Sequence, residues 1–376
     1  MTLQVVAVQD KKDLKTFIRL PNQIYRNDPN WVAPLEFERK QFFNPQKNPF
    51  YRHGESELFL AFKEGVPAGR ISAQIHHGHL DKYRDAAGFF GFFESMDDKN
   101  VAQALIDAAQ VWLQKKGMKK MRGPFNFSMY DNEAGILIDG FEHRPAILMG
   151  YNPRYYPALL EGAGFKKIKD LYAYTYTVGA ITPPVLELDK VTREHPGLTL
   201  RSVNMKKFDE DIRLMMQIFN EAWDKNWGFV PTTEEEIRYI AKSLKPIIDP
   251  EMAFFAHVNG DPAAFSISLP DIHEAIHDLR GKLFPLGWAK LLWRIKIKRL
   301  KSLRLCLMGI RKPYRGSAVG ALSVLMNTEA HRRGQSRGYQ KGELGWTLED
   351  NEKINRGIEF MGGRRYKTYR IFEKEI

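Results

Sequence analysis

The chain has 376 residues, of which 43% are hydrophobic and 27% charged, and its formal net charge is +12. This length and composition supply apolar side chains for two or three packed domains and exclude a disordered or collagen-like protein. The single cysteine, Cys306, excludes a disulfide framework and a cysteine-rich metal site. The first residues show no basic segment followed by an apolar stretch, and no run reaches the roughly 18 apolar residues of a membrane span, so we expect a cytoplasmic protein.

The first half of the chain alternates between helical and strand patterns. In chain order, these patterns predict a helix over 14–25, two strands joined at Glu64-Gly65, a strand over 88–93, a helix over 101–116 and a closing helix that ends at Gly164-Phe165. The segment 179–198 has prolines near both ends and no clear amphipathic period, so we interpret it as a linker.

The second half repeats this order of elements. Its patterns predict a helix over 208–223, two strands joined at Asn259-Gly260, a strand over 303–310, a helix over 319–333, a strand over 343–349 and a closing helix up to Gly363. The repeat predicts an α/β protein with a mixed sheet, built from two lobes in tandem. The lobes are expected over 1–178 and 199–376.

Positive charge is concentrated in the second half. Between Leu279 and Thr328 the sequence has twelve Lys or Arg residues and no acidic residue, which favours an anionic partner for this stretch. We expect a basic helical insertion over 271–302. Its segment 285–304 has an apolar stripe that either touches an anionic membrane surface or packs on its own domain, and the sequence leaves both alternatives open.

The loop after the strand that ends at Ile310 has the features of an anion site. Small residues between a strand and a helix leave backbone N–H groups open, and a helix start carries about half a positive charge. The residues expected to hold a pyrophosphate in this way are Arg315, Gly316, Ser317, Ala318, Val319 and Gly320. The corresponding loop of the first half, 95–100, is acidic and contains no glycine, so only the second half can bind a pyrophosphate in this manner.

The segment 315–320 resembles the pyrophosphate loop of the GNAT acyltransferase superfamily, Q/R-x-x-G-x-G/A, with Ala318 at the first glycine position. With Tyr151-Asn152-Pro153 and the segments 343–346 and 366–370, the chain is similar to a tandem, two-lobed bacterial branch related to bacterial ceramide synthases. The resemblance implies two GNAT-like lobes, an acyl-CoA co-substrate and an amine acceptor that can be lipid-like. It also implies that the pantetheine arm lies beside the strand end, at Met308, Gly309 and Ile310.

An amine acceptor must lose a proton before it attacks, and a carboxylate is the natural base. A period of two places Glu343, Glu349 and Asn351 on one face of the predicted strand, and we expect Glu343 or Glu349 to be the base. The alternative is that these acids pair with nearby cations or face water. In the resembled family a tyrosine of the closing helix often protonates the thiolate; the matching position here is Ile358, and Tyr366 is a substitute by proximity.

Two other functions compete with acyl transfer. The sequence His273-Glu274-Ala275-Ile276-His277 has the H-E-x-x-H pattern of zinc hydrolases, but no third ligand follows at the required spacing, so we expect no metal. A noncatalytic protein that binds lipid or RNA on a degenerate acyltransferase fold is the main alternative. Nucleic acid is disfavoured because the basic stretch contains no recognition motif. We therefore expect a cytoplasmic N-acyltransferase, with a peripheral position on the inner membrane face if the acceptor is a lipid.

Overall fold

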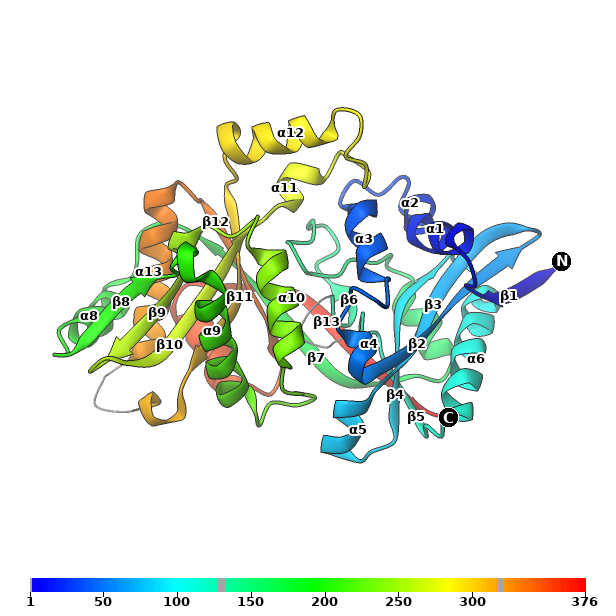
Figure 1. Ribbon diagram of the computed structural model, residues 1–376, viewed down its shortest axis with the longest axis horizontal. Coiled ribbons are helices and arrows are strands. Elements are labelled where there is room, and N and C mark those ends of the chain that lie inside the picture. Colours follow the sequence, from blue (N-terminus) through cyan, green and yellow to red (C-terminus); the bar gives the residue numbers. More distant parts are fainter. Residues whose placement is uncertain (1, 128–132, 317–320) are drawn as a thin grey trace. The chain divides into compact units, whose positions relative to one another are not determined.

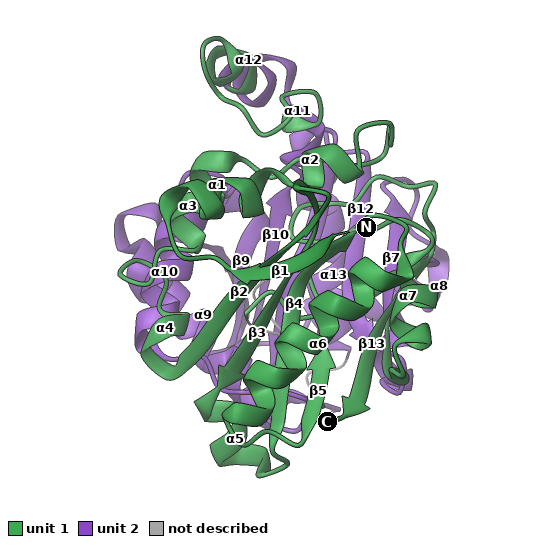
Figure 2. Ribbon diagram, turned by 90° about the vertical axis from the view of Figure 1, so that its right-hand side faces the viewer, with its two compact units in different colours: residues 1–171, 276–291, 367–376 green, residues 172–275, 292–366 purple. Residues whose placement is uncertain are grey.

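The computed structural model describes residues 2–127, 133–316 and 321–376, and the chain separates into two compact units. Unit 1 contains residues 1–171, 276–291 and 367–376, and unit 2 contains residues 172–275 and 292–366 (Figure 2). In each unit, helices pack on strands of a sheet (Figure 1). Among the described residues, no helix is both long and apolar enough to cross a membrane.

Unit 1 has the strand order β1-β2-β3-β4-β5, with the C-terminal part of β13 beside β5. Its strands are β1 (Leu3–Ala7), β2 (Gly54–Lys63), β3 (Val66–His76), β4 (Ala87–Ser95), β5 (Lys120–Gly123) and β6 (Ile136–Asp139). Its helices are α1 (Lys11–Arg19), α2 (Pro21–Ile24), α3 (Glu36–Phe42), α4 (Phe50–His53), α5 (His77–Tyr83), α6 (Lys99–Lys115) and α7 (Tyr156–Gly162). The helix α6 packs on β2 and β3, and it buries Val101, Leu105 and Leu113 at helical spacing in the core of the unit.

Unit 2 has the strand order β12-β11-β10-β9-β8, in which β11 and β12 are parallel and the other neighbours antiparallel. Its strands are β8 (Leu198–Ser202), β9 (Ala253–Val258), β10 (Asp261–Pro270), β11 (Ser302–Ile310) and β12 (Lys341–Leu348). Its helices are α8 (Pro183–Arg193), α9 (Phe208–Trp223), α10 (Glu234–Leu244), α13 (Leu322–Arg337), α14 (Glu352–Phe360) and the short turns η1 (Met205–Lys207), η2 (Pro250–Met252) and η4 (Lys312–Tyr314). The buried side chains of Leu322, Leu325 and Met326 pack α13 against β9 and β10.

Both predicted hairpins are present, β2–β3 and β9–β10. Their turns have the same backbone: φ is +53° and +78° at Glu64 and Gly65, and +52° and +86° at Asn259 and Gly260. Two consecutive residues with positive φ match the right-handed twist of the flanking strands, which favours Asn-Gly and tolerates Glu-Gly. The repeat seen in the sequence is therefore also a repeat of local geometry, and the α/β fold with two lobes is confirmed.

The compact units differ in extent from the lobes expected over 1–178 and 199–376. The strand β7 (Lys166–Thr177) begins in unit 1 and ends in unit 2, and β13 (Arg364–Glu375) begins in unit 2 and ends in unit 1. Residues 372–375 of β13 pair antiparallel with β5. The carboxyl-terminal part of the last strand thus belongs to the sheet of the first half, a long-range pairing that leaves no periodic signal in the sequence.

The segment 179–198, interpreted above as a linker, contains the helix α8. Its two prolines stand in the first turn, where a missing N–H costs nothing and the proline φ suits a helix. The buried residues Val185, Asp189 and Thr192 lie on one side of the helix, and α8 packs on α13. The polar character of two of these buried residues hid the amphipathic period.

The expected insertion lies between β10, which ends at Pro270, and β11, which begins at Ser302. It contains α11 (His273–Ile276), α12 (Gly287–Trp293) and the π-helical turn η3 (Arg294–Lys298). Two hydrogen bonds join its ends, from Asp271 N to Ser302 O (2.9 Å) and from Lys301 N to Glu274 Oε2 (2.9 Å). The strands β10 and β11 are therefore hydrogen-bonded up to the base of the insertion, as two strands joined by a tight turn would be.

Candidate active site

The parallel strands β11 and β12 are paired only near their amino-terminal ends. The ladder joins residues 302–305 to residues 341–344, whereas β11 continues to Ile310 and β12 to Leu348. Where the ladder stops, the register of β11 against β10 shifts so that Cys306 is an extra residue. A bulge of this kind bends a strand and redirects the residues after it. The carboxyl end of β11 is therefore an edge at which an extended ligand can lie.

The backbone of β11 indicates which groups line this edge. Arg311 N donates to Ala263 O of β10 at 2.9 Å. Because successive residues of a strand face opposite sides, the backbone groups of Met308 and Ile310 point away from β10. Their carbonyls accept hydrogen bonds from the Trp223 indole (3.3 Å) and from Arg315 Nε (2.8 Å), respectively. The N–H groups of the same two residues face the same side and are suitably placed to donate to a ligand.

Gly309 lies between these two residues and has a packing requirement of its own. A Cβ atom at this position would come within 2.6 Å of the Phe265 ring on β10. Real Cβ atoms do not approach a neighbour so closely, so a larger residue would displace the strand edge. Of the residues expected beside a pantetheine arm, Met308 and Ile310 thus offer backbone groups, and Gly309 allows the close packing beneath them.

Glu343 lies on β12 opposite Arg304 of β11 and is only 5% exposed. The hydroxyl of Tyr366 donates to Glu343 Oε2. Arg304 Nε lies 3.8 Å from Glu343 Oε1, and Arg304 also donates to Gly345 O at 3.0 Å, which ties the two strands together beyond their ladder. Oε1 accepts no hydrogen bond from the described part of the chain. A buried carboxylate oxygen in this state can accept a proton or a hydrogen bond from a ligand.

The other residues of the predicted catalytic face do not share a strand with Glu343. The strand β12 ends at Leu348, Glu349 lies in a turn, and Asn351 is the residue that precedes α14. The side chain of Asn355 on α14 donates to Leu348 O (2.9 Å) and to Glu349 O (3.4 Å). These bonds from the following helix end the strand, so the period of two stops before Glu349. Tyr366, expected by proximity, is the predicted residue that contacts Glu343.

The basic loop after β11 is partly outside the described residues, because Ser317, Ala318, Val319 and Gly320 are not among them. Arg315 uses its guanidinium to donate to Ile310 O and, at 2.7 Å, to Ala222 O at the end of α9. Gly316 follows with φ of +64°, a conformation that glycine adopts without strain. Arg311 forms an ion pair with Glu221 at 2.8 Å. The two arginines before the loop are therefore held by α9.

The starts of the helices α6 and α13 differ as the sequence predicts, with an acidic residue at the first and none at the second. In unit 1, Asp98 caps α6 by accepting from Asn100 N (2.8 Å) and Val101 N (3.4 Å), and Lys63 forms an ion pair with it at 2.6 Å. In unit 2, the residue before α13 is Ala321, which has no side-chain acceptor, and the first turn of α13 contains no acid. A carboxylate occupies the anion-binding end of α6, whereas the end of α13 carries no such charge.

The helix α8, which the sequence pattern did not reveal, contacts the start of α13. Thr192 Oγ1 accepts from Ala321 N at 3.1 Å, one residue before α13. Asp189 is fully buried and accepts hydrogen bonds from Thr328 and Arg332 of α13 and from Arg193. The spacing of Val185, Asp189 and Thr192 was the available signal for this helix. The helix α8 thus holds the first turns of α13 in place.

Among the described residues, the segment of the competing zinc motif does not have the arrangement of a zinc-hydrolase site. The helix α11 ends at Ile276, so His277 follows it, and Glu274 accepts a backbone hydrogen bond from Lys301. Within the described residues, neither His273 nor His277 belongs to a group of three ligand side chains. The carboxylate that would activate a zinc-bound water is instead engaged in closing the insertion.

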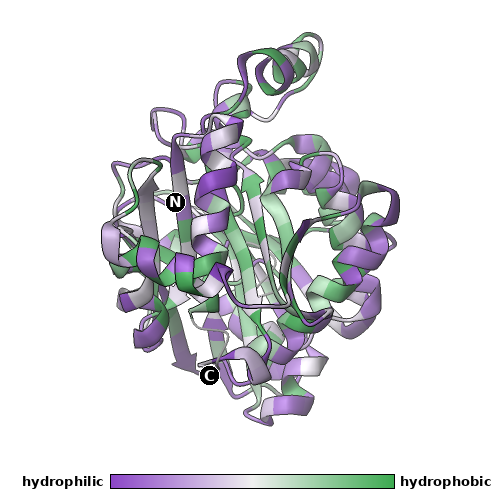
Figure 3. Ribbon diagram, turned by 90° about the vertical axis from the view of Figure 1, so that its left-hand side faces the viewer, coloured by the Kyte–Doolittle hydropathy of each residue, from purple (hydrophilic) through white to green (hydrophobic). Residues whose placement is uncertain are grey.

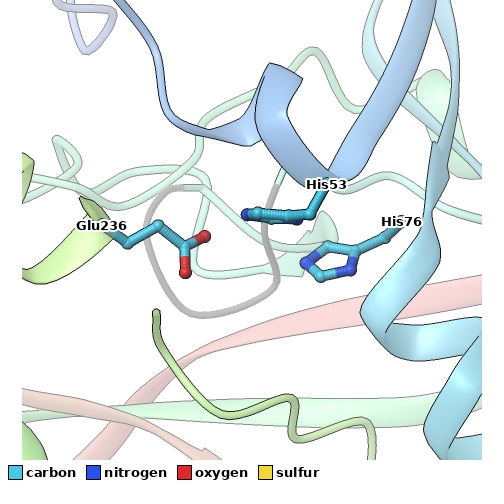
Figure 4. A group of neighbouring side chains, drawn as sticks. All are labelled: His53, His76 and Glu236. Atoms are coloured by element: carbon cyan, nitrogen blue, oxygen red, sulfur yellow. The ribbon is translucent and has the colours of Figure 1, made fainter. Parts of the chain in front are cut away.

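Histidines of the first half have structural partners within unit 1. The rings of His53 and His76 lie 4.6 Å apart between centroids (Figure 4), and His76 Nδ1 accepts from His79 N at 3.2 Å at the start of α5. His79 is buried and pairs with Asp85 at 3.1 Å. Glu236, drawn in the same figure, belongs to α10 of unit 2, where it accepts from Thr233 N at 2.7 Å in a capping box.

Comparison with known proteins places these features in a family. No family model matches the chain. The chain is 41% identical to a protein named bacterial ceramide synthase from Caulobacter vibrioides, over 100% of this chain and 98% of that protein. It belongs to the bacterial ceramide synthase family. It is also 38% identical to Protein YghO of Escherichia coli, over 98% of this chain and 94% of that protein.

Solved structures identify the fold of this ceramide synthase family member. A tandem GNAT protein from the clavulanic acid biosynthesis pathway matches 100% of this chain and 98% of its own, with a TM-score of 0.58 at 12% identity. A GCN5-related N-acetyltransferase from Sphaerobacter thermophilus matches with a TM-score of 0.55 at 13% identity, over 99% and 95% of the two chains. The chain therefore has the tandem GNAT fold, and it is an acyltransferase.

Proposed function

We propose that this protein transfers an acyl group from acyl-CoA to the primary amine of a long-chain, lipid-like acceptor. One observation carries the proposal: the edge of β11 that β12 leaves unpaired leads through a basic loop into α13. The start of α13 has no carboxylate, whereas the equivalent helix α6 is capped by Asp98. The acceptor class rests on the name of the Caulobacter vibrioides relative, which is a ceramide synthase. Ceramides are N-acylated long-chain amines.

The donor is bound along β11 in this proposal. The start of α13 and residues 315–320 hold the pyrophosphate, because backbone N–H groups and the helix dipole favour an anion there. Lys312 and Arg315 add positive charge at the start of the loop. The pantetheine arm then extends beside Met308, Gly309 and Ile310, where backbone groups pointing away from β10 can pair with its amides.

The chemical step is direct attack of the amine on the thioester. The nitrogen–carbon bond forms as the carbonyl oxygen takes up negative charge, and a backbone N–H of β11 stabilises that charge, which is typically worth about 3 kcal/mol of barrier. The tetrahedral intermediate expels the CoA thiolate when the carbon–sulfur bond breaks. The amine transfers its proton to Glu343, directly or through a water molecule, since the buried Oε1 atom accepts no hydrogen bond from the described residues.

Tyr366 supports this base by binding Oε2, the other carboxylate oxygen. Glu349 and Asn351, placed with Glu343 by the sequence pattern, lie in the turn before α14 and are not proposed as the base. The aromatic residues Trp223, Phe219 and Phe229 form a cluster, and the Trp223 indole binds Met308 O on the β11 edge. We propose that this cluster forms part of the wall beside the reacting carbonyl.

The test is a pair of measurements on the full-length protein. Calorimetry with CoA and with acyl-CoAs of increasing chain length should give one site per chain, with affinity rising as the acyl chain lengthens. A thiol reagent should then report CoA release when a long-chain primary amine is added, and much slower release with the N-acetylated form of the same amine. CoA release that does not depend on a free amine would contradict N-acylation, and the absence of CoA binding would contradict the donor site.

A further inference from the structure

The insertion between β10 and β11 carries a concentration of exposed apolar side chains. The six large hydrophobic residues exposed on its segment 284–297 are Phe284, Leu286, Trp288, Leu292, Trp293 and Ile297. Phe284 is 81%, Leu286 75% and Ile297 69% exposed. Figure 3 shows hydrophobic and hydrophilic residues side by side on α12, at the top of the view. Apolar patches of this kind on a water-soluble fold mark an interaction site.

The same segment is strongly basic. Between residues 279 and 301 the chain has Arg280, Lys282, Lys290, Arg294, Lys296, Lys298, Arg299 and Lys301 and no acid. The cations Lys296, Lys298 and Arg299 are exposed next to Ile297, and Asp278 forms an ion pair with Lys290. Cations that border exposed tryptophan and aliphatic side chains are complementary to a surface with an anionic outer layer and an apolar interior.

The frame of the insertion is held by hydrogen bonds. Within unit 1, Glu36 N donates to Gly281 O at 3.0 Å, and Trp288 N donates to Leu283 O at 2.8 Å at the start of α12. Within unit 2, Arg294 donates to Ala275 O at 2.6 Å. Gly281 has φ of +77°, and a Cβ atom there would lie 2.6 Å from Pro34 O. The apolar side chains are thus exposed from an ordered segment.

We infer that residues 284–299, here named the insertion surface, dock the protein on an anionic lipid bilayer. The tryptophans occupy the headgroup boundary, where amphipathic rings are favoured, the aliphatic residues enter the acyl region, and the lysines contact lipid phosphates. The inference rests on exposure and charge alone and is independent of the reaction proposed above. A nucleic acid would leave Leu286, Leu292 and Ile297 without apolar contacts, so the observations favour a bilayer.

The experiment measures co-sedimentation of the full-length protein with vesicles. One set is phosphatidylcholine alone and the other contains about 30% phosphatidylglycerol, each at low and high salt, because screening weakens charge attraction. The protein should bind the anionic vesicles at least tenfold more tightly, and high salt should remove most of this difference. The double variant Trp288→Ser and Trp293→Ser should lose at least tenfold in binding to the anionic vesicles. Replacement of Lys296 and Lys298 by Gln should lower anionic binding severalfold and leave phosphatidylcholine binding unchanged.

The matched control removes two exposed aromatic residues outside the insertion. Phe37 on α3 is 66% exposed and Phe360 on α14 is 47% exposed, and replacing both by Ser should not change vesicle binding. Equal binding by the wild-type protein and the tryptophan variant would overturn the inference. So would a change of oligomeric state in the tryptophan variant with vesicle binding intact, which would identify a protein interface. Vesicle binding without CoA release would support docking while contradicting the proposed reaction.

Discussion

Tyr366 donates a hydrogen bond to Oε2 of Glu343, and both residues belong to unit 2. The bond fixes one carboxylate oxygen, while Arg304 lies beside the other at 3.8 Å. A base whose position is set before the substrate arrives needs little rearrangement during proton transfer. This relationship makes Glu343 and Tyr366 the first residues to vary.

Replacing Glu343 by Gln keeps the size of the side chain and removes the proposed proton acceptor. We expect amine-dependent CoA release to fall by about 10² to 10³, a typical contribution of a general base, with CoA affinity changed less than about threefold. Stopped-assay turnover and calorimetry measure the two quantities. Glu349→Gln is the matched control in the turn after β12 and should retain activity. A loss of turnover in the control with Glu343→Gln unaffected would assign the base to Glu349.

Tyr366→Phe removes the hydroxyl that holds Glu343 and leaves the ring. Turnover should fall by about tenfold. A hydrogen bond to a charged group is worth about 1.5 to 3 kcal/mol, and we expect the carboxylate of Glu343 to recover part of this energy by moving to another partner. The acyl-CoA KM should stay constant, because the hydroxyl does not line the donor site. If KM rises while kcat is unchanged, Tyr366 acts on binding and not on the base.

Ala321→Asp would give α13 the same carboxylate cap that Asp98 gives α6. We expect the helix to gain stability from the cap. We also expect CoA to bind about tenfold more weakly, because the added carboxylate repels the pyrophosphate and one charge at a helix terminus changes the binding free energy by about 1 kcal/mol. Ala321→Asn is the matched control: it caps equally well without charge and should bind CoA within about threefold of the wild type. Equal affinities for the two variants would show that the pyrophosphate lies elsewhere.

Asp189→Asn tests the contact between α8 and α13. Burial alone would raise the pKa of Asp189, but hydrogen bonds from Thr328, Arg332 and Arg193 hold it below its ordinary value. We expect a loss of about 2 to 3 kcal/mol in the free energy of unfolding at pH 7, since arginines at a buried site lose their anionic partner. Urea unfolding measures this loss. Glu187→Gln, an exposed position on the same helix, should change it by less than about 0.5 kcal/mol.

The pH dependence of that loss has a defined sign. A carboxylate with a depressed pKa in the folded state stabilises above its unfolded pKa of about 3.9 and loses this effect as the pH falls through the lower folded value. The difference between wild type and Asp189→Asn should therefore be constant from about pH 5 to 7 and shrink below about pH 4. A difference that persists unchanged at low pH would assign the effect to packing and not to charge.

Local patterns were sufficient to predict much of this fold. The helix over 208–223 and the two hairpins follow from apolar periodicity and from turn residues that accept positive φ. The features missed depend on distant partners. The strand β12 ends at Leu348 because Asn355 binds its last carbonyls, and α8 is a helix whose buried face includes the charged Asp189.

The candidate site was predictable to a similar extent. Residue type and strand position named Glu343 and Glu349 equally as candidate bases, and they did not distinguish between the two. The contact of Glu343 with Tyr366 was not predicted, because that contact joins β12 to β13 across the turn and helix between them, and the sequence suggested Tyr366 only as a substitute for the missing tyrosine of the closing helix. The difference between the two helix starts was visible directly in the sequence, which has the acidic Asp98 before α6 and small uncharged residues before Leu322.

The hydrogen bond that closes the insertion at Asp271 and Ser302 has a consequence for the segment above it. Because the antiparallel neighbours β10 and β11 stay paired up to this bond, a change in the length of the segment between them need not disturb the two strands. At the corresponding corner of the first half, β3 and β4 are joined by the short helix α5 and a few flanking residues. The insertion therefore presents its exposed side chains without interrupting the sheet that carries Glu343.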